Sequence, residues 1–448
     1  MKISRRRLLQ GGALTGATMA IPGPLQRALF APNQARASGV GEPILVMVQL
    51  GGGNDGLNTV IPVNDGPVYP QRTEYDLARD TIAIDPADLG PTTIGLDPEK
   101  DNTLALHPAL IELKAMFDAG KVAVIQGVAY EDQNLSHFRS EDIWFDGERV
   151  APFSDGWFGR YLEAHYPAVF PDPAPLVTVD VDGTLSKMFV CQGGCNVLAV
   201  KKLSQFELPD DPVAPDAAAK KAALEAAYAV EADPAATSGL QNTVGGSGKI
   251  LLDKIEEYEQ IDTNWGSNLG GVSGSLAKRL TEVASIIRHD VLPTTTPVGA
   301  RYFHVRLGGF DTHTNQGGLT GRQASLFRQL SQSLSAFYQD LADIDAAEGS
   351  NLAERTLAVT FSEFGRRVAE NGGGGTDHGC GSVLFAVGDC VNGGIYGTMP
   401  DIGDPDSRGN LKHGYDFRQV YSTILANWLG VSPDPLLPES PHAPIAFV

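Results

Sequence analysis

The sequence predicts an α/β fold in which helices cover both faces of a mostly parallel sheet. Short apolar runs typical of buried strands alternate along the chain with longer amphipathic segments typical of helices. This alternation favours parallel strands joined by helical crossovers. The 448 residues suffice for a large core. No internal repeat and no coiled-coil heptad pattern is evident.

Six apolar runs are predicted to be strands: 44–50, 122–127, 176–181, 302–307, 356–361 and 383–387. Periodic apolar residues or alanine-rich composition predict helices at 108–117, 217–232, 276–287, 326–341 and 417–428. The polar, glycine-rich stretch 237–248 is predicted to be a loop. We expect a single domain over residues 38–448, in which the helical segment at about 205–290 could be an inserted cap.

The first 37 residues have the features of a twin-arginine signal peptide. Ser4-Arg5-Arg6-Arg7-Leu8-Leu9 is basic, an apolar stretch follows at 11–21, and small residues stand at 35–37. Prolines at 22 and 24 argue against an ordinary buried helix. We therefore expect the protein in the periplasm or secreted, with the twin-arginine export machinery as a partner. No later apolar run approaches the ~18 residues of a stable membrane span.

The charge of the chain excludes one class of partner. The formal net charge is −20, and the predicted signal peptide contains basic residues but no acidic ones. The remainder is therefore more acidic still. Nucleic-acid phosphates are bound by lysine and arginine, so a nucleic-acid partner is not expected.

The four cysteines form two local pairs, Cys191 with Cys195 and Cys380 with Cys390. In an oxidising compartment two disulfides are the favoured interpretation. The alternative is a four-thiolate metal site, for which these spacings are poor. The pairing is left open, although a bridge from Cys380 to Cys390 would stiffen the loop between them.

The glycine-rich segment Gly51–Gly56 follows the first predicted strand and formally satisfies G-x-G-x-x-G. A dinucleotide site requires a helix to begin within this motif, but the chain continues as a β-like stretch ended by Pro62. A tight turn is the plainer interpretation, with Asp55 bonding nearby amides. The alternative, which is more specific, is that Asp55 is a metal ligand.

Ser136 stands at the start of a predicted helix, after the second strand. The simplest role for this serine is a helix N-cap. A serine at a helix N-terminus is also well placed as a nucleophile, because free amides and the helix dipole stabilise an incoming oxyanion. In that role His137 and Arg139 could assist it.

Two further strand ends carry carboxylates and imidazoles. Asp311 and His313 follow two glycines after the strand at 302–307, and the pair suits zinc or a similar divalent ion. The strand at 356–361 leads to Glu363 and Arg366, and a glycine run then precedes Asp377-His378. Ligands bind beyond the carboxyl ends of strands in open α/β sheets, so these groups are expected to share one site.

The motifs together closely resemble DUF1501, a family of exported bacterial proteins. The resemblance rests on segments 50–62, 134–144, 308–313, 361–379 and 421–430. That family is similar to the alkaline phosphatase and sulfatase superfamily, which implies an α/β/α sandwich. The resemblance implies a serine nucleophile at Ser136 and metal ligands at Asp55, Asp311, His313, Glu363 and His378. Asp377, beside His378, is a further candidate ligand from its position in the sequence.

The sequence differs from the superfamily where Glu363-Phe364 replaces an Asp-His pair and Asp311-x-His313 replaces a wider spacing. A one-metal enzyme, an altered ion and a site that binds without turnover are all compatible with these changes.

The leading hypothesis is a metal-dependent hydrolase of small anionic phosphate or sulfate esters, in which Arg139 or Arg366 holds the anionic oxygens. The expected cofactor is a divalent ion such as Zn, Mn or Ca. One alternative is a non-catalytic exported binding or assembly protein with the same fold. Another is a cofactor oxidoreductase.

Overall fold

The structure is a computed structural model that describes residues 41–149, 155–167, 175–193, 195–206, 217–231, 239–439 and 442–448. The predicted signal peptide lies outside these residues. Residues 38–448 group into one compact unit. Within the described residues, no helix combines the length and the apolar character needed to cross a membrane.

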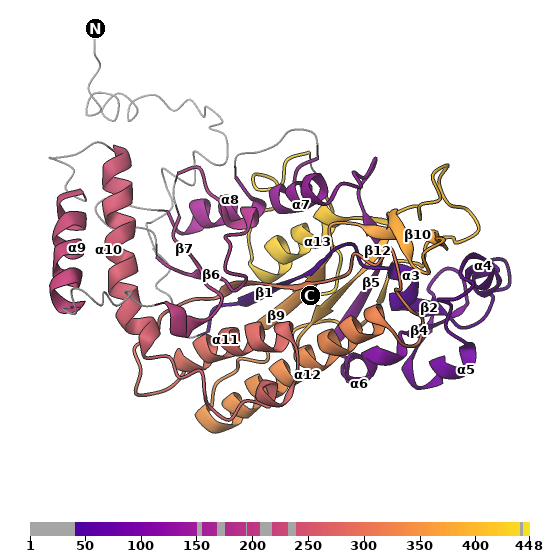
Figure 1. Ribbon diagram of the computed structural model, residues 1–448, viewed down its shortest axis with the longest axis horizontal. Helices are drawn as coiled ribbons and strands as arrows, with labels where there is room; N and C mark the ends of the chain where they lie inside the picture. Colours follow the sequence, from indigo (N-terminus) through magenta and orange to yellow (C-terminus); the bar gives the residue numbers. More distant parts are fainter. Residues whose placement is uncertain are drawn as a thin grey trace, which may run out of the picture. The chain divides into compact units, whose positions relative to one another are not determined.

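A central sheet runs through this unit (Figure 1). In the described residues its strand order is β13 (Gly394–Tyr396), β5 (Val122–Ala129), β12 (Ser382–Val387), β9 (Thr356–Phe361), β1 (Ile44–Gly51), β8 (Tyr302–Gly308), β6 (Thr178–Asp180) and β7 (Val197–Ala199), and β14 (Tyr415–Asp416) also pairs with β5. Every pairing in this sheet is parallel except those of β12, which is antiparallel to β5 and β9. The predicted α/β class with a mostly parallel sheet is confirmed.

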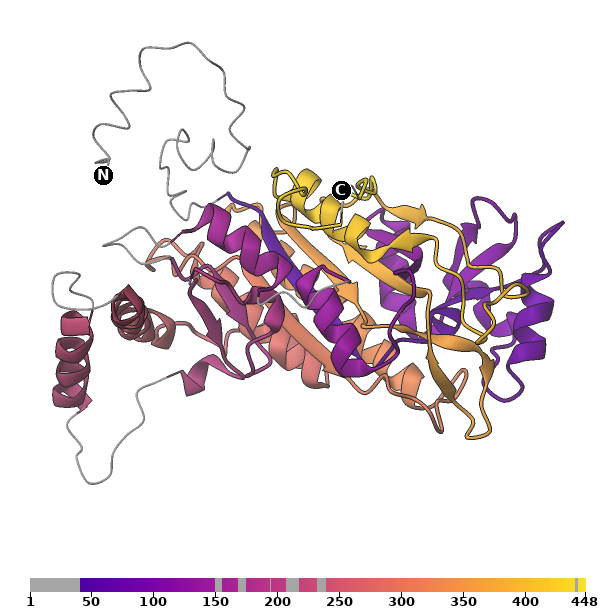
Figure 2. The same cartoon turned by 90° about the horizontal axis from the view of Figure 1, so that it is seen from above.

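Helices cover both faces of the sheet (Figures 1 and 2). On one face lie α6 (Ile111–Asp118), α11 (Ser275–His289) and α12 (Arg322–Glu348), and on the other lie α7 (His137–Asp146), α8 (Trp157–His165) and α13 (Phe417–Thr423). The last helix continues as a π-turn, η6 (Ile424–Trp428). The described residues also contain α3 (Gly56–Thr59), α4 (Gln71–Ala78), α5 (Pro86–Leu89), α9 (Ala217–Glu231) and α10 (Gly239–Glu259).

The alternation of side chains along β1 separates the two cores. Val46 and Val48 pack in the cluster that contains the apolar residues of α11 and α12. Leu45 and Met47 pack in the other cluster, with the apolar residues of α7, α8 and α13. Since successive strand residues point to opposite faces, an uninterrupted apolar run is required for a strand buried on both sides. The buried strand predicted at 44–50 is therefore confirmed.

Two small antiparallel sheets flank the central one. The first joins β2 (Val60–Pro62), β4 (Thr103–Leu106) and β3 (Thr93–Leu96). The second is a hairpin of β10 (Gly365–Glu370) and β11 (Thr376–Gly379), which connects β9 to β12. The glycine run that the sequence placed before Asp377 is the turn of this hairpin.

The six predicted strands are confirmed, but the predicted loop at 237–248 is wrong. Helix α10 begins at Gly239 and continues through this stretch. Later in the same helix, Leu252 and Ile255 are buried. These buried residues anchor the helix, and extending an existing helix costs much less free energy than nucleating a new one. The extension can therefore include glycines, although each glycine costs about 1 kcal/mol relative to alanine.

One of the two expected disulfides is present. Cys191 and Cys195 are bonded, whereas Cys380 and Cys390 are free thiols. A disulfide between Cys380 and Cys390 does not form because these two cysteines lie beyond opposite ends of β12, which spans six residues. An extended strand of that length covers about 20 Å, and a disulfide needs Cα atoms within about 7 Å of each other.

Candidate metal centre

The strand directions bring four chain segments to one edge of the sheet. Strands β1, β5, β8 and β9 run in the same direction, so the residues that follow each of them meet at this edge. Strand β12 runs in the opposite direction and begins there. The hairpin residues Asp377 and His378, which precede β12, therefore reach the same place as the other strand ends.

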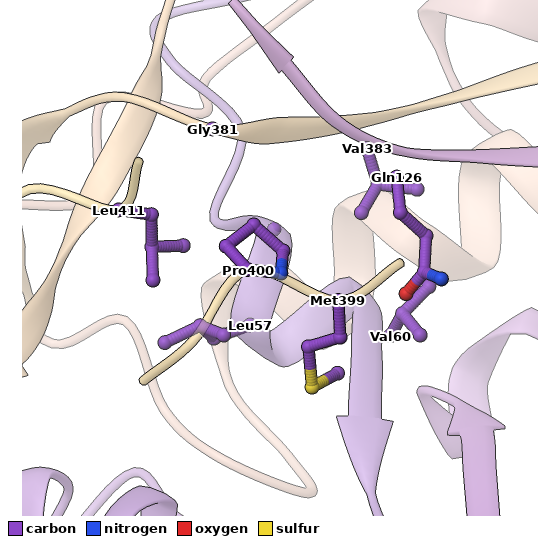
Figure 3. Close-up of a pocket in the computed structure, with 9 residues that line it drawn as sticks. Leu57, Val60, Gln126, Gly381, Val383, Met399, Pro400 and Leu411 are labelled. Carbon is purple, nitrogen blue, oxygen red and sulfur yellow. The ribbon is translucent and has the colours of Figure 1, made fainter. Parts of the chain in front are cut away.

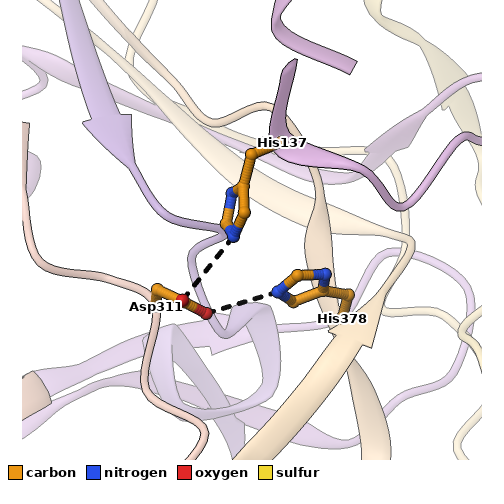
Figure 4. A group of neighbouring side chains, drawn as sticks. All are labelled: His137, Asp311 and His378. Carbon is orange, nitrogen blue, oxygen red and sulfur yellow. Dashed lines mark hydrogen bonds and ion pairs between the residues drawn. The ribbon is translucent and has the colours of Figure 1, made fainter. Parts of the chain in front are cut away.

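Imidazoles from three of these segments converge on the carboxylate of Asp311. The Nε2 atom of His378 lies 3.3 Å from Asp311 Oδ1, and the Nε2 atom of His137 lies 3.6 Å from Oδ2 (Figure 4). His313 adds a third Nε2, 3.2 Å from Asp311 Oδ1 and 2.9 Å from His378 Nε2. Asp311 is 45 % exposed, so the cluster is open to solvent.

The opposite nitrogen of each imidazole has its own acceptor. The Nδ1 atom of His137 lies 2.7 Å from Glu363 Oε1, and that of His313 lies 3.1 Å from Asp377 Oδ1. The Nδ1 atom of His378 lies 2.8 Å from the carbonyl oxygen of Leu135. A carboxylate or carbonyl oxygen can only accept, so each Nδ1 carries the proton.

This tautomer leaves three Nε2 lone pairs directed at one carboxylate. Such an arrangement of lone pairs and negative charge is repulsive unless a proton or a metal cation lies between them. The mutual distances of Asp311 Oδ1, His313 Nε2 and His378 Nε2 are 3.2, 2.9 and 3.3 Å. Ligands of a tetrahedral ion with bonds of 2.0–2.1 Å are about 3.3 Å apart. Asp311, His137 and His378 also offer donor atoms within 4.8 Å of one another. Asp311 and His378 belong to both groups, so these two residues with either His313 or His137 form a candidate donor set for one divalent ion.

Two of the groups at the cluster carry the charge that a metal site requires, and one does not. The hydrogen bond from His137 to Glu363 raises the pKa of that imidazole and so favours its protonated form, whereas burial lowers the pKa of His378. Burial opposes ionisation of Asp311, but the hydrogen bond and charge of Arg366 outweigh it and lower the pKa to about 2. Asp311 is therefore an anion and His378 favours the neutral form, as metal coordination requires.

Glu363 and Asp377 were predicted to be ligands, but each contacts an imidazole on the side away from the cluster. Glu363 is only 1 % exposed and also accepts from the amide of Gly52 at 2.8 Å. Asp377 accepts from the side chain of Asn371 at 3.0 Å, and this bond lowers the pKa of Asp377. Carboxylates in this position orient a ligating imidazole and increase its basicity. Asn371, at the start of the hairpin turn, was not predicted.

Arg366 positions the loops of the site. Its side chain is 0 % exposed, and its donors reach Asp311 Oδ1 at 2.8 Å and four backbone carbonyl oxygens. Those carbonyls belong to Gly52, Gly53, Phe310 and Thr376. A guanidinium with these partners has no free edge for the substrate role that was predicted for it.

The glycine-rich loop after β1 packs closely around these groups. A Cβ atom on Gly52 would collide with the backbone of Asp311, and one on Gly53 would collide with the ring of Phe364. Both glycines have positive φ values, of 122° and 86°. The helix that follows, α3, has only four residues. The glycines thus allow the loop to pack closely against Asp311 and Phe364. This arrangement does not support a dinucleotide site.

Asp55 is held in a buried ion pair outside the imidazole cluster. Its two carboxylate oxygens accept from the guanidinium of Arg79, and Gln316 Nε2 donates to Oδ2 at 2.6 Å. Asp55 Oδ1 also accepts from the amide of Leu57 at 3.2 Å, as the N-cap of α3. These contacts explain the residue without a metal ion. The structure does not bring Asp55 together with the other predicted ligands.

Ser136 occupies the N-cap position of α7, as predicted, but its side chain makes no capping hydrogen bond. The residue before it is Leu135, whose carbonyl oxygen accepts from His378 Nδ1. The residue after it is His137, whose Nε2 atom lies near Asp311 Oδ2. Ser136 itself is exposed and stands in the chain between these two residues. Arg139 instead donates to the carbonyl oxygen of Arg149 at 3.3 Å.

The ring of Phe364 packs against two of the imidazoles. Its centroid lies 4.4 Å from that of His378 and 4.8 Å from that of His137. A separate small pocket is lined mainly by apolar side chains, among them Leu57, Val383 and Met399 (Figure 3). None of the residues that line it belongs to the cluster.

The fold and site define an α/β protein with a candidate one-metal centre at the carboxyl edge of its sheet. Residues 294–437 contain a DUF1501 domain, described as a protein of unknown function. This range includes β8, the β10–β11 hairpin and α13, and hence Asp311, His313 and His378. No match to the chain is found among curated proteins.

Proposed function

We propose that the chain is an exported metal-dependent hydrolase of phosphate or sulfate esters. The convergence of three imidazole Nε2 atoms on the carboxylate of Asp311 is the observation that carries the proposal. Imidazole nitrogen suits zinc and related transition ions, whereas calcium prefers oxygen ligands. Among the ions expected from the sequence, zinc and manganese therefore fit this donor set better than calcium.

A relation to the alkaline phosphatase and sulfatase superfamily supports the proposed chemistry. The supporting features are the sheet covered on both faces, the serine at a helix start and the acidic and histidine groups at the strand ends. The differences at Asp55, which pairs with Arg79, and at Phe364 favour one ion over two. Because the fold alone does not determine function, the proposal depends on the site.

In the proposed reaction the Ser136 Oγ atom attacks the phosphorus or sulfur atom of the ester. A bond from Oγ to that atom forms, the bond to the ester oxygen breaks, and an alcohol leaves with a proton. Water then releases the inorganic anion from Ser136. A bound divalent ion supplies neutralisation of the anionic group. The free N-terminal amides of α7 stabilise added negative charge near Ser136.

The export assignment rests on the twin-arginine pattern in residues 1–37. The disulfide between Cys191 and Cys195 is compatible with an exported protein, because such bonds persist in oxidising compartments.

Turnover by the purified, metal-loaded protein tests the nucleophile. Aryl phosphates and aryl sulfates are suitable probes because release of the phenol is followed directly. We expect Ser136→Ala to abolish hydrolysis while metal content and thermal stability are unchanged. The exposed serine variant Ser273→Ala is the matched control. Hydrolysis by Ser136→Ala at the wild-type rate would remove the proposed nucleophile.

A non-catalytic binding protein is the second candidate, and the packing of Phe364 favours it. The phenyl ring fills space beside His137 and His378 where the superfamily would supply a further imidazole. This candidate predicts that the wild-type protein retains its ion and hydrolyses neither class of ester.

A further inference from the structure

We infer that Arg306 is the residue that binds the anionic oxygens of the substrate at the candidate metal centre. The inference rests on the proposed function and assigns its substrate-binding group. Of the two arginines predicted for this role, Arg366 is fully engaged with backbone carbonyls and Asp311. Arg139 donates to the carbonyl of Arg149, whereas Arg306 is connected through Glu141 and Gly51 to the segments that carry the cluster.

The position of Arg306 in the sheet places its guanidinium above the glycine-rich loop. Arg306 lies near the end of β8, paired with Gln49 of β1. A Cβ atom on Gly51 would lie 2.5 Å from Arg306 Nε. The absence of a side chain at Gly51 thus gives the arginine room to extend toward the edge of the sheet where the imidazoles converge.

A short series of contacts joins Arg306 to the imidazole cluster. Gly51, beneath the guanidinium, is followed by Gly52, whose amide donates to Glu363 Oε1 at 2.8 Å. The same Oε1 atom lies 2.7 Å from His137 Nδ1. The guanidinium therefore lies against Gly51, and His137 is linked through Glu363 to the next residue of the same loop, Gly52.

Helix α7 provides a second connection. Glu141 lies one turn after His137 on this helix, so the two side chains are on the same face. Glu141 Oε1 accepts from Arg306 Nη2 at 3.1 Å and from Gln49 Nε2 at 2.8 Å. The carboxylate thereby fixes the orientation of Arg306 beside the cluster.

Arg306 also differs from Arg366 in its exposure. Its side chain is 38 % exposed, against 0 % for Arg366, and Glu141 engages it through one terminal nitrogen. An arginine has five donors in a planar fork that matches pairs of oxyanion oxygens. A guanidinium that is oriented, exposed and only partly engaged is suited to a phosphoryl or sulfuryl group.

Calorimetric titration of the metal-loaded protein with inorganic phosphate, and separately with sulfate, tests this assignment. We expect Arg306→Gln to weaken binding of the anion at least about tenfold, because charged hydrogen bonds contribute roughly 1.5–3 kcal/mol. Arg408→Gln, at an exposed arginine that pairs with Asp406, is the matched control and should bind as the wild type does. Metal content should be the same in all three proteins.

Loss of Arg306 leaves the carboxylate of Glu141 without its charged partner, so the double variant Arg306→Gln/Glu141→Gln is measured as well. It should fold normally and bind the anion as weakly as Arg306→Gln. Wild-type affinity in a folded Arg306 variant would overturn the assignment. Failure of the metal-loaded wild type to bind either anion would overturn it too, but would leave the metal centre intact. Absence of metal from the wild type would instead remove the proposed function on which the assignment rests.

Discussion

The Nε2 atoms of His313 and His378 lie 2.9 Å apart, while the Nδ1 atom of each imidazole faces an oxygen acceptor. Two neutral imidazoles in these tautomers would direct lone pairs at each other. A proton could relieve that repulsion for one pair of nitrogens. Asp311 and His137 add further lone pairs nearby, and a divalent ion held by Asp311, His378 and one of the other two imidazoles would relieve the repulsion among its ligands.

The carboxylate of Glu363 is expected to strengthen metal binding through His137. Replacing it in the variant Glu363→Gln keeps the shape and an acceptor for His137 Nδ1 but removes the charge. We expect affinity for zinc to fall by roughly 10–100-fold, as is usual for such partners of ligating imidazoles. Competition with a chromophoric chelator measures this affinity. Glu370→Gln, at the end of β10, is the control, and equal losses in the two variants would contradict the assigned role.

Arg366 is expected to act on stability. Its buried guanidinium binds carbonyl oxygens of three loops, so Arg366→Lys would leave several of them unsatisfied. We expect the free energy of unfolding to fall by about 3–5 kcal/mol. Arg139→Lys should change it by no more than about 0.5 kcal/mol. Denaturant unfolding measures both values. Normal stability in Arg366→Lys, combined with lost turnover, would restore a direct role in substrate binding.

Burial of His107 is expected to make stability depend on pH. Burial lowers the pKa of His107 to about 4, whereas an unfolded histidine has a pKa of about 6.5. Between these values the unfolded chain binds the proton more tightly, so stability falls as the pH is lowered through this window. The full effect of this residue is at most about 3 kcal/mol.

The variant His107→Asn isolates this contribution. Asparagine can still accept from the amide of Ala109, as His107 Nδ1 does at 3.0 Å. We expect the wild type to lose more stability than His107→Asn between pH 7 and pH 5, as measured by urea unfolding. Identical pH profiles would show that His107 titrates normally. His413→Asn, at an exposed position, is the control.

The thiol chemistry should distinguish the two cysteine pairs. Denatured protein without reductant is expected to show two reactive thiols, and reduced protein four. In the native state both free cysteines should react slowly at pH 8, because burial raises the pKa of Cys380 to about 11 and that of Cys390 to about 12. Titration with a chromogenic disulfide reagent tests this. No reactive thiol after denaturation would contradict the structure.

Much of the fold could be predicted because buried parallel strands have uninterrupted apolar sequences, as in β1 and β9. The same pattern predicted that the candidate site residues would lie at one edge of the sheet. The antiparallel direction of β12, which brings His378 to that edge, could not be predicted from it. Direction depends on pairing between strands that are distant in sequence, and no local pattern encodes it.

The roles of individual side chains were less predictable than their location. Asp55 follows a strand as a ligand should, but the guanidinium of Arg79 neutralises it, and nothing near Asp55 in the sequence indicates that partner. Glu363 and Asp377 contact the outer nitrogens of imidazoles. Whether a carboxylate binds a metal directly or through an imidazole depends on differences of a few ångströms in three dimensions.

Metal content of the purified protein tests the central claim most directly. We predict about one zinc or manganese ion for each chain, removed by a chelator and restored on adding either metal, as expected for a site with protein ligands and an open position. The double variant His313→Gln/His378→Gln should lose the ion while His413→Gln retains it. A folded wild-type protein that carries no ion and binds neither metal in calorimetric titration would contradict the proposed centre.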